Sequence, residues 1–499
     1  MAKSIMIQGT GSGVGKSLIV AALCRIFKEK GLKVAPFKSQ NMALNSFVTC
    51  EGGEIGRAQA GQAEAAGILP SVYMNPILLK ATGEAGSQVI LMGKVHSNMT
   101  ASQYYAFKDE AWQAVLEAWE RLSQQYEVII IEGAGSPAEI NLMDCEIVNM
   151  AVARYTKSPV ILVGDIDKGG VFASLYGTIK LLEQDAHLIK AFIINKFRGD
   201  LNILLPGNEL LQKKTGIPVI GVLPHLGSLG LNEEDGMALD NSNLIKHYKC
   251  EPLKIVVLRL KYISNFTDYD SLMYEPDVAL KYSLRYDDIV SADIVIIPGS
   301  KNTIKDLTHL RQVGIEEALK TAHKNGAQII GICGGFQMLG KTIKDPYGME
   351  SDQPEAEGLR LLDGITTLDK TKTTCQVKAA TIGALPMCNQ KFNNIKGYEI
   401  HLGKTVCHDG LFKITRLNED LSYSDGQFKD NVWGTYIHGI FDNDDLRRSL
   451  INSVREKRGL DIFTDKHIIY EEFKEQTLQL WTEAVKTHID MKFIYEITL

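Results

Sequence analysis

The stretch from Ser4 to Gly31 constrains the fold more than any other part of this sequence. It begins with a short apolar run, continues as the glycine-rich segment GTGSGVGKS, and ends in a segment with apolar residues at helical spacing. This order predicts a strand, a phosphate-binding loop and a helix. Backbone N–H groups in such a loop point at phosphate oxygens, and the helix N-terminus adds positive potential. The stretch therefore predicts a nucleoside triphosphate site in an α/β fold.

Within the loop, Lys16 is expected to reach the β- and γ-phosphates, and the Ser17 hydroxyl is expected to bind Mg²⁺. The glycines expected to bring the backbone close to the phosphates are Gly11, Gly13 and Gly15. The loop departs from the commonest pattern, because five residues rather than four separate Gly9 from the Gly-Lys pair. A glycine-rich turn without a ligand is the plainer alternative. A dinucleotide-binding fold is disfavoured because the segment contains no G-x-G-x-x-G.

Further candidate residues follow other apolar runs that are typical of buried strands. Glu132 comes directly after the run 128–131, where a phosphate-loop protein places its second Mg²⁺ contact. A surface glutamate in a tight turn is the alternative. Asn195 ends another such run and is a candidate for nucleotide binding, and polar residues from 38 to 45 follow a third strand. Because ligands bind at the carboxyl ends of parallel strands, these positions predict one active edge of a sheet.

The composition excludes several classes of protein. A net charge of −6 argues against a nucleic-acid partner, which needs a basic face. No uncharged apolar run approaches the roughly 18 residues of a membrane helix, so we expect no membrane contact and a cytoplasmic location. The eight cysteines form no C-x-x-C pair, which argues against a disulfide framework and against structural zinc.

Alternating strand and helix patterns occur twice along the 499 residues, separated by a polar segment without periodicity. The fold class is therefore α/β, with a phosphate-loop parallel-sheet domain, a second α/β domain and a helical tail. The predicted domain limits are 1–235 for the first domain, 236–252 for a linker, 253–445 for the second domain and 446–499 for the tail.

The second domain contains the segment GICGG after an apolar run, and Cys333 is its central residue. Flanking glycines permit a sharp strand-to-helix turn that exposes the thiol, and a helix N-terminus favours the thiolate. About a hundred residues later another strand delivers His438, a candidate general base. A buried structural cysteine is the alternative, but it does not explain why both patterns occur together.

With both sites identified, the sequence resembles the cobyric acid synthase family, the glutamine-dependent amidoligases of corrinoid biosynthesis, across nearly its full length. The segments that carry the resemblance are GTGSGVGKS, PFKSQNMALNS, IEGAGSPAEINL, DIDKGGVFASLYGT, INKFRGD, PGSKNTIKDL, GICGGFQMLG, GYEIHLGKT and TYIHGIFD. The first domain is similar to dethiobiotin synthetase, and the second is similar to class I glutamine amidotransferases.

Two departures accompany this resemblance. Most class I amidotransferases have a glutamate two residues after the histidine, whereas Ile440 stands there in this chain, so the third member of the triad has no assigned residue. Members of the family also tend to have aspartate where Glu146 stands.

The resemblance implies conversion of the b, d, e and g carboxylates of adenosylcobyrinic acid a,c-diamide to amides, with ATP, Mg²⁺ and L-glutamine. In the second domain, Cys333 would attack glutamine, His438 would protonate the ammonia, and backbone N–H groups at Gly299 and Gly334 would form the oxyanion hole. Candidates for contacting the corrinoid are Arg57, Lys80, Asp144, Glu146, Asp165, Lys168 and Arg198.

Two other functions compete with this one. The sister enzyme that amidates only the a and c positions shares both domains, but the segments DIDKGGVFASLYGT and INKFRGD favour cobyric acid synthase. A nucleotide-switch ATPase with an inert amidotransferase module is less favoured, because such switches place an extra lysine early in the loop. Only Lys16 occurs between Gly9 and Ser17.

Overall fold

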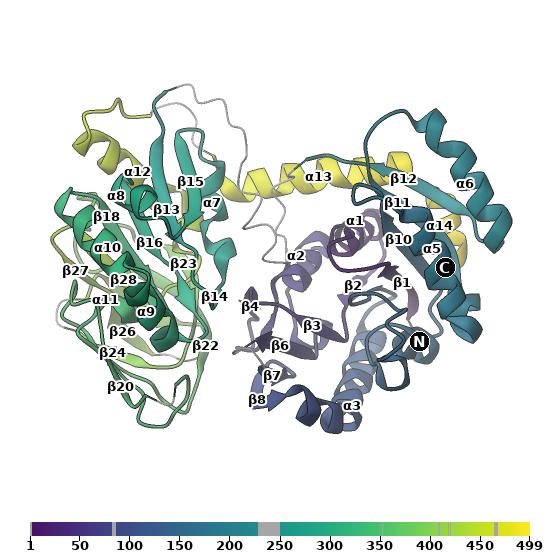
Figure 1. The fold of residues 1–499 in the computed structure, drawn as a ribbon, viewed down its shortest axis with the longest axis horizontal. Helices are drawn as coiled ribbons and strands as arrows, with labels where there is room; N and C mark the ends of the chain where they lie inside the picture. The colour runs from purple at the N-terminus through teal and green to yellow at the C-terminus, as the bar shows by residue number, and fades with distance from the viewer. Residues whose placement is uncertain are drawn as a thin grey trace.

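The computed structural model describes residues 2–81, 86–227, 250–351, 353–407, 410–417, 419, 421–463 and 468–499. The described chain forms two α/β domains that lie side by side (Figure 1). The predicted fold class is therefore confirmed. Most of the predicted linker, 236–249, and the predicted boundary at 235 lie outside the described residues.

The N-terminal domain is built on a six-stranded parallel sheet with the order β12-β11-β10-β1-β9-β2. Its strands are β1 (Lys3–Gly9), β2 (Val34–Phe37), β9 (Val128–Glu132), β10 (Val160–Asp165), β11 (Ile189–Phe197) and β12 (Val219–Pro224). Its helices are α1 (Lys16–Glu29), α2 (Arg57–Ala66), α3 (Ala101–Gln125), α4 (Met150–Thr156), α5 (Val171–Leu181) and α6 (Leu201–Thr215). The central strands are buried along almost their whole length, as their continuous apolar runs predict.

Smaller sheets extend this domain toward the C-terminal domain (Figure 1). One contains β3 (Gln40–Met42), β6 (Ile77–Ala81), β7 (Gly86–Leu91) and β8 (Lys94–Thr100), and a hairpin pairs β4 (Ser46–Val48) with β5 (Glu54–Gly56). Val48 packs with Tyr398 and Ile400 of the C-terminal domain. The β4–β5 hairpin is therefore part of the contact between the two domains.

The C-terminal domain has a second six-stranded sheet with the order β15-β13-β16-β18-β28-β27, in which only the edge strand β27 is antiparallel. Its strands are β13 (Leu253–Leu258), β15 (Val278–Ser283), β16 (Ile294–Ile297), β18 (Gln328–Ile332), β27 (Gln427–Lys429) and β28 (Val432–Thr435). Its helices are α7 (Asp270–Tyr274), α8 (Tyr286–Val290), α9 (Thr303–Gln312), α10 (Ile315–Lys324), α11 (Gly334–Leu339) and α12 (Asp444–Lys457).

Three small sheets complete the C-terminal domain. They consist of β14 (Ile263–Ser264) with β17 (Gly299–Ser300), of β19 (Thr342–Lys344), β20 (Glu355–Glu357), β21 (Ile365–Thr367) and β24 (Lys404–Val406), and of β22 (Thr373–Thr381), β23 (Ile395–His401), β25 (Phe412–Arg416) and β26 (Ser422–Asp425). None of the described helices combines the length and apolarity that a membrane span requires.

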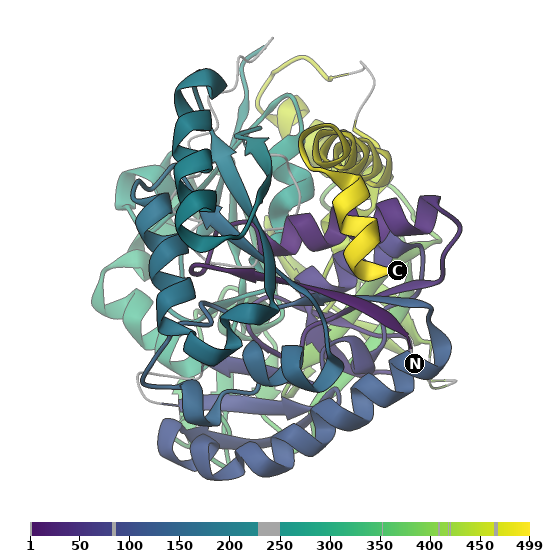
Figure 2. The same cartoon turned by 90° about the vertical axis from the view of Figure 1, so that its right-hand side faces the viewer.

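The helical tail returns from the C-terminal domain to the N-terminal one (Figures 1 and 2). Helix α13 (Tyr470–His488) begins against the C-terminal domain, where Tyr470 N donates to Asp444 Oδ1 at 3.0 Å. Its far half packs on α1, and Trp481 Nε1 donates to the Leu18 carbonyl oxygen at 2.7 Å. Helix α14 (Met491–Thr498) follows and packs near β1. The tail thus fastens the two domains to each other.

We expect Trp481→Ala to lower the free energy of unfolding by about 3–5 kcal/mol, because the side chain is only 3 % exposed and fills the α1–α13 contact. Urea unfolding followed by circular dichroism measures this change. Leu480→Ala is the matched control, since the neighbouring side chain is 67 % exposed and its loss should change stability by less than about 0.5 kcal/mol. Equal effects of the two substitutions would contradict the packing role of Trp481.

Candidate active sites

The phosphate loop connects β1 to α1 at the carboxyl end of the N-terminal sheet. Gly15 has a φ of +98°, and a Cβ there would lie 2.2 Å from Asn195 Nδ2. Asn195 in turn donates to the Val14 carbonyl oxygen at 2.8 Å, so it braces the loop from the adjoining strand. Lys16 Nζ donates to the Gly11 carbonyl oxygen at 2.8 Å. The structure therefore brings together the residues that the sequence predicts for nucleotide binding.

Lys196 is a member of this site that the sequence analysis missed. Its Nζ donates to the Gly13 carbonyl oxygen at 2.7 Å and pairs with Asp165 Oδ2 at 3.1 Å. Asp165 is buried at the end of β10, where it also accepts a hydrogen bond from the Asp167 backbone at 2.9 Å. Asp165, which we expected to contact substrate, is therefore linked through Lys196 to the phosphate loop.

Glu132 lies at the end of β9 and is the centre of a buried polar cluster. Its carboxylate accepts hydrogen bonds from Ser17 Oγ and Lys38 Nζ at 2.8 Å each, and from Gln62 Nε2 at 2.5 Å and Gln59 Nε2 at 3.3 Å. Burial raises the pKa of Glu132, but the adjacent Lys38 ammonium outweighs it and the pKa lies below its usual value. The carboxylate is therefore ionised at neutral pH. Lys38, Gln59 and Gln62 were not predicted as partners of Glu132, although Lys38 lies in the polar segment 38–45 that follows a predicted strand.

The Ser17–Glu132 pair fits a Mg²⁺ ion. Ser17 Oγ and Glu132 Oε1 are 2.8 Å apart, close to the roughly 3 Å between neighbouring oxygens in an octahedral site with bonds of about 2.1 Å. Among the described residues, no three His, Cys, Asp or Glu side chains gather to hold a metal by themselves. The pair therefore suits an ion that is completed by phosphate and water.

A large cavity opens beside the phosphate loop, between α1, α2 and α13. Its volume is about 820 Å³, and Ser17 and Arg57 both line it. Arg57 lies at the first position of α2, with its guanidinium 5.2 Å from the centre of the Phe47 ring. Burial lowers the pKa of Arg57, but Glu64 and other nearby groups outweigh this and raise it. The guanidinium group of Arg57, a permanent cation, thus lines a cavity that extends to Ser17, the candidate Mg²⁺ ligand.

The other residues predicted to contact the corrinoid do not gather in this cavity. Lys80 is fully buried and paired with Glu54, so we no longer expect it to contact a substrate. The Glu146 carboxylate accepts hydrogen bonds from backbone N–H groups at the start of α4, including that of Asn149 at 2.6 Å, and acts as a helix cap. Lys168 is exposed, and Arg198 pairs with Asp167 at 3.0 Å. Asp144 belongs to the 3₁₀ turn Met143–Cys145, and its side chain lies outside the described residues.

The second site contains the predicted nucleophile elbow. Cys333 lies between β18 and α11 with a φ of +52°, a strained conformation for a residue with a side chain. A Cβ at Gly335 would lie 1.9 Å from the Ile297 carbonyl oxygen, and one at Gly331 would lie 2.7 Å from the Gly335 backbone. Only glycines allow so tight a turn. The packing around the elbow therefore holds Cys333 in its strained position.

His438 follows β28, and its partner is a residue that the sequence analysis did not find. His438 Nδ1 donates to Asp268 Oδ2 at 2.6 Å, and Asp268 also accepts from the Tyr398 hydroxyl at 3.0 Å. Burial lowers the pKa of His438, but Asp268 and Cys333 outweigh it and raise the pKa to about 10. His438 Nε2 is buried without a hydrogen-bond partner among the described residues, so it is available for the reacting groups. Asp268 occupies the role for which no residue could be assigned from sequence.

Gly299 and Gly334, the predicted oxyanion-hole residues, approach the same site. A Cβ at Gly299 would lie 3.3 Å from the His438 ring, and one at Gly334 would lie 2.9 Å from the Ser300 backbone nitrogen. Both backbones therefore lie close to the catalytic pair. Their role in stabilising an oxyanion remains a prediction.

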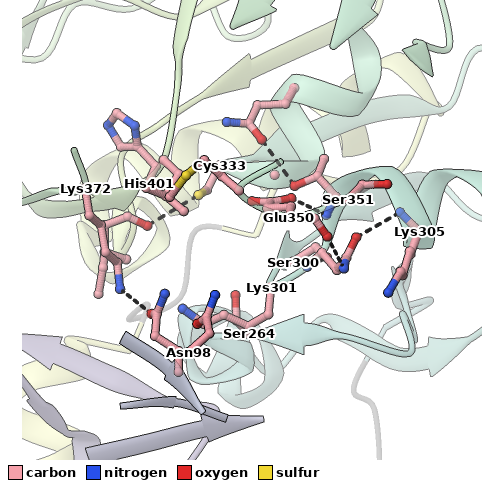
Figure 3. A pocket seen from close by; sticks show the side chains of 18 of the residues that line it. Asn98, Ser264, Ser300, Lys301, Lys305, Cys333, Glu350, Ser351, Lys372 and His401 are labelled. Carbon is pink, nitrogen blue, oxygen red and sulfur yellow. Dashed lines mark hydrogen bonds between the residues drawn. The ribbon is translucent and has the colours of Figure 1, made fainter. Parts of the chain in front are cut away.

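Cys333 opens into a pocket of about 230 Å³ (Figure 3). Lys301, Glu350, Lys372 and His401 contribute side chains to its walls. Asn98 and Gln88 also line it, although both belong to the N-terminal domain. The pocket has room for a small amino acid and carries charges of both signs.

Comparison with known proteins agrees with this arrangement of two sites. Residues 5–239 match the family described as the CobQ/CobB/MinD/ParA nucleotide binding domain. Residues 254–446 match the CobB/CobQ-like glutamine amidotransferase domain.

Full-length relatives decide the family. A cobyric acid synthase from Thermodesulfovibrio yellowstonii is 51% identical over 100% of this chain and 99% of its own length. The chain belongs to the cobyric acid synthase family. Cobyric acid synthases from Clostridium botulinum and Salmonella heidelberg are 49% and 46% identical, each over 100% of this chain and 99% and 98% of their own lengths. The resemblance stated from sequence motifs is thereby confirmed.

In this member of the cobyric acid synthase family, we expect Asp268→Asn to reduce glutamine hydrolysis by about 10²-fold or more. Asp268 raises the pKa of His438 to about 10, which keeps the ring protonated through neutral pH. Without the Asp268 charge, the His438 ring loses its proton at lower pH. A neutral ring stabilises the Cys333 thiolate less than a protonated ring does. Rates of glutamine hydrolysis and of iodoacetamide labelling, both measured from pH 6 to 10, report the change.

The rate of Cys333 labelling at neutral pH should therefore fall in Asp268→Asn. Asp270→Asn is the control, because Asp270 lies on the same segment, whereas the carboxylate bonded to His438 Nδ1 is that of Asp268. An unchanged profile in Asp268→Asn would show that Asp268 does not govern the charge of His438.

Proposed function

We propose that this chain makes cobyric acid: it uses ATP and L-glutamine to convert the b, d, e and g carboxylates of adenosylcobyrinic acid a,c-diamide to amides. The observation that carries the proposal is full-length similarity to cobyric acid synthases together with two separate sites on one chain. One site suits phosphoryl transfer, and the other suits release of ammonia from an amide.

The N-terminal site activates the acid. A carboxylate is a poor electrophile, so the γ-phosphoryl group of ATP is transferred to it, which gives an acyl phosphate and ADP. Lys16 and the backbone of the phosphate loop bind the phosphates and stabilise the charge on the transferred group. Ammonia then attacks the acyl carbon, and inorganic phosphate leaves with formation of the amide.

Ser17 and Glu132 would hold a Mg²⁺ ion, which would neutralise charge on the ATP phosphates. Lys38 and Gln62 hold the Glu132 carboxylate in place by hydrogen bonds. The adjoining cavity of about 820 Å³ is the place proposed for the corrinoid. Its walls carry two cations, Arg57 and Lys474, together with Glu64, Glu471, Glu472 and Glu475.

The C-terminal site supplies ammonia. The Cys333 thiolate attacks the side-chain amide carbon of glutamine, and His438 donates a proton to the departing ammonia, which leaves a thioester. Water activated by His438 then hydrolyses the thioester to glutamate and restores the thiol. Asp268 holds the His438 ring in the orientation and charge state that both steps need.

One competing function differs from this one in the number of amide groups made, and the other differs in the amount of glutamine consumed. The sister a,c-diamide synthase would stop after two amide groups, and the names of the full-length relatives disfavour it. A nucleotide-switch ATPase would hydrolyse ATP without consuming glutamine in proportion. Mass spectrometry of corrinoid products over time, with glutamine consumption measured in parallel, separates all three.

We expect Cys333→Ala to lose glutamine-dependent synthesis almost completely, because no other group can form the thioester. Synthesis from ammonium chloride should persist and should rise with pH as free ammonia increases. The matched variant is Lys16→Ala, which should lose synthesis with both nitrogen donors because it blocks acyl phosphate formation. Amide product from Lys16→Ala, or glutamine use by Cys333→Ala, would contradict the division between the two sites.

Glu132→Gln should raise the Mg²⁺ concentration required for half-maximal ammonia-dependent synthesis by at least about tenfold. The substitution keeps the shape of the side chain but removes the negative charge that attracts the cation. A Mg²⁺ titration of synthesis measures the effect. If the requirement is unchanged, the metal is held by a different group, and the Ser17–Glu132 assignment fails.

A further inference from the structure

The walls of the Cys333 pocket come from both domains. Lys372 lies just before β22 of the C-terminal domain, and its ammonium pairs with the carboxylate of Glu54 on β5 of the N-terminal domain. Its Nζ also donates to Gln88 Oε1 of the N-terminal domain at 3.5 Å. The pocket is therefore complete only when the two domains are in contact.

Positive charge is in excess at this end of the pocket. Glu54 is 1 % exposed and pairs with both Lys372 and the fully buried Lys80. Burial raises the pKa of Glu54, but Lys372, Lys80 and Lys301 outweigh it and hold the pKa well below its usual value. One carboxylate thus pairs with two ammonium groups and lies near a third.

Lys301 and Lys372, two of the three lysines that line the pocket, retain capacity to bind an anion. Lys372 uses its ammonium for Glu54 and Gln88, which leaves one of its three donors free. Lys301 makes no ion pair within the described chain. Burial lowers the pKa of Lys372 and the neighbouring Lys301 lowers it further, so that despite Glu54 the pKa falls to about 8. An anionic group placed here would supply the missing charge.

We propose that Lys372 and Lys301 bind the α-carboxylate of L-glutamine, and that Glu54 of the N-terminal domain is the residue that positions Lys372. This inference rests on the proposed hydrolysis of glutamine in the Cys333 pocket. Cys333 lines the same pocket as these two lysines. A glutamine whose side-chain amide lies at the thiol therefore places its α-carboxylate and α-ammonium groups against the pocket wall. Glu350 also lines the pocket, where burial raises its pKa to about 7, so an α-ammonium group bound beside it would favour its ionised form.

The arrangement makes the N-terminal domain part of glutamine recognition. Ser46, whose hydroxyl accepts from Lys80 Nζ at 2.6 Å, also donates through its backbone to Asn265 Oδ1 at 3.1 Å across the domain contact. Glu54, Lys80 and Ser46 therefore form one buried unit that presents a fixed carboxylate to Lys372. A shift of the N-terminal domain would move Lys372 and weaken glutamine binding.

The test compares L-glutamine with L-glutaminamide, in which a neutral carboxamide replaces the α-carboxylate. Ammonia release by the full-length chain is measured for the wild type, Lys372→Met and Lys301→Met. We expect each substitution to raise KM for glutamine by about 10- to 100-fold, the effect of losing a charge-assisted hydrogen bond, with kcat changed less than about threefold. With L-glutaminamide the same substitutions should change KM by less than about threefold.

The outcomes are distinct. Equal increases in KM for both substrates would show that the lysines do not recognise the α-carboxylate. An increase in KM for glutamine only in Lys301→Met would show that Lys372 and Glu54 take no part in binding it. Lys370→Met is the matched control, because this exposed lysine lies on the same loop outside the pocket. If the wild type released no ammonia from glutamine, the proposed function itself would have failed.

Glu54→Gln tests the positioning role. It should raise KM for glutamine but not for L-glutaminamide, whereas general damage to the domain contact would affect both substrates. Ammonia-dependent corrinoid synthesis by the same preparation reports whether the N-terminal domain is intact. Should this variant fail to fold, Gln88→Leu removes the other N-terminal contact of Lys372 and is expected to raise KM for glutamine in the same selective way.

Discussion

A buried carboxylate shared between the two domains is the interaction on which their mutual arrangement depends. Glu54 lies on the N-terminal hairpin and pairs with Lys80 of its own domain and Lys372 of the other. Removing one partner from such a buried pair typically costs about 3–5 kcal/mol, because the remaining charge is left uncompensated. The pair therefore does more to fix the orientation of the domains than to add net stability. It fixes that orientation at the pocket that contains Cys333.

Both active sites follow from the same property of parallel sheets. In each domain a buried strand ends in a reactive segment, and a helix begins directly after it: the phosphate loop between β1 and α1, and Cys333 between β18 and α11. Parallel strands direct all their carboxyl ends to one edge, so residues far apart in sequence meet there. Glu132 meets Ser17 in this way, and His438 approaches Cys333 from the neighbouring strand β28. Both sites thus lie on a strand–turn–helix unit at the carboxyl end of a parallel sheet.

Residues within one strand–turn–helix unit could be predicted from the sequence, because their chemistry depends on local spacing. The phosphate loop, the Cys333 elbow and the candidate His438 are of this kind. Asp268 and the Glu54–Lys372 pair could not be found, since 170 and 318 residues separate the partners and neither segment has a distinctive motif. Lys80 illustrates the opposite error: a lysine in a strand gives no sign that a buried carboxylate will neutralise it.

Among the described residues, contacts at two places hold the domains together, which matters for the proposed passage of ammonia between sites. The Glu54–Lys372 pair connects the domains beside the Cys333 pocket, while α13 crosses from Asp444 to α1 and also lines the cavity next to Ser17. A single contact would leave the domains free to rotate about it, whereas two contacts at different places remove that freedom. Holding two reactants in a fixed relative position raises their effective concentration. The crossing tail therefore maintains the relation between the Cys333 pocket and the phosphate-loop site, between which the proposed reaction would pass ammonia.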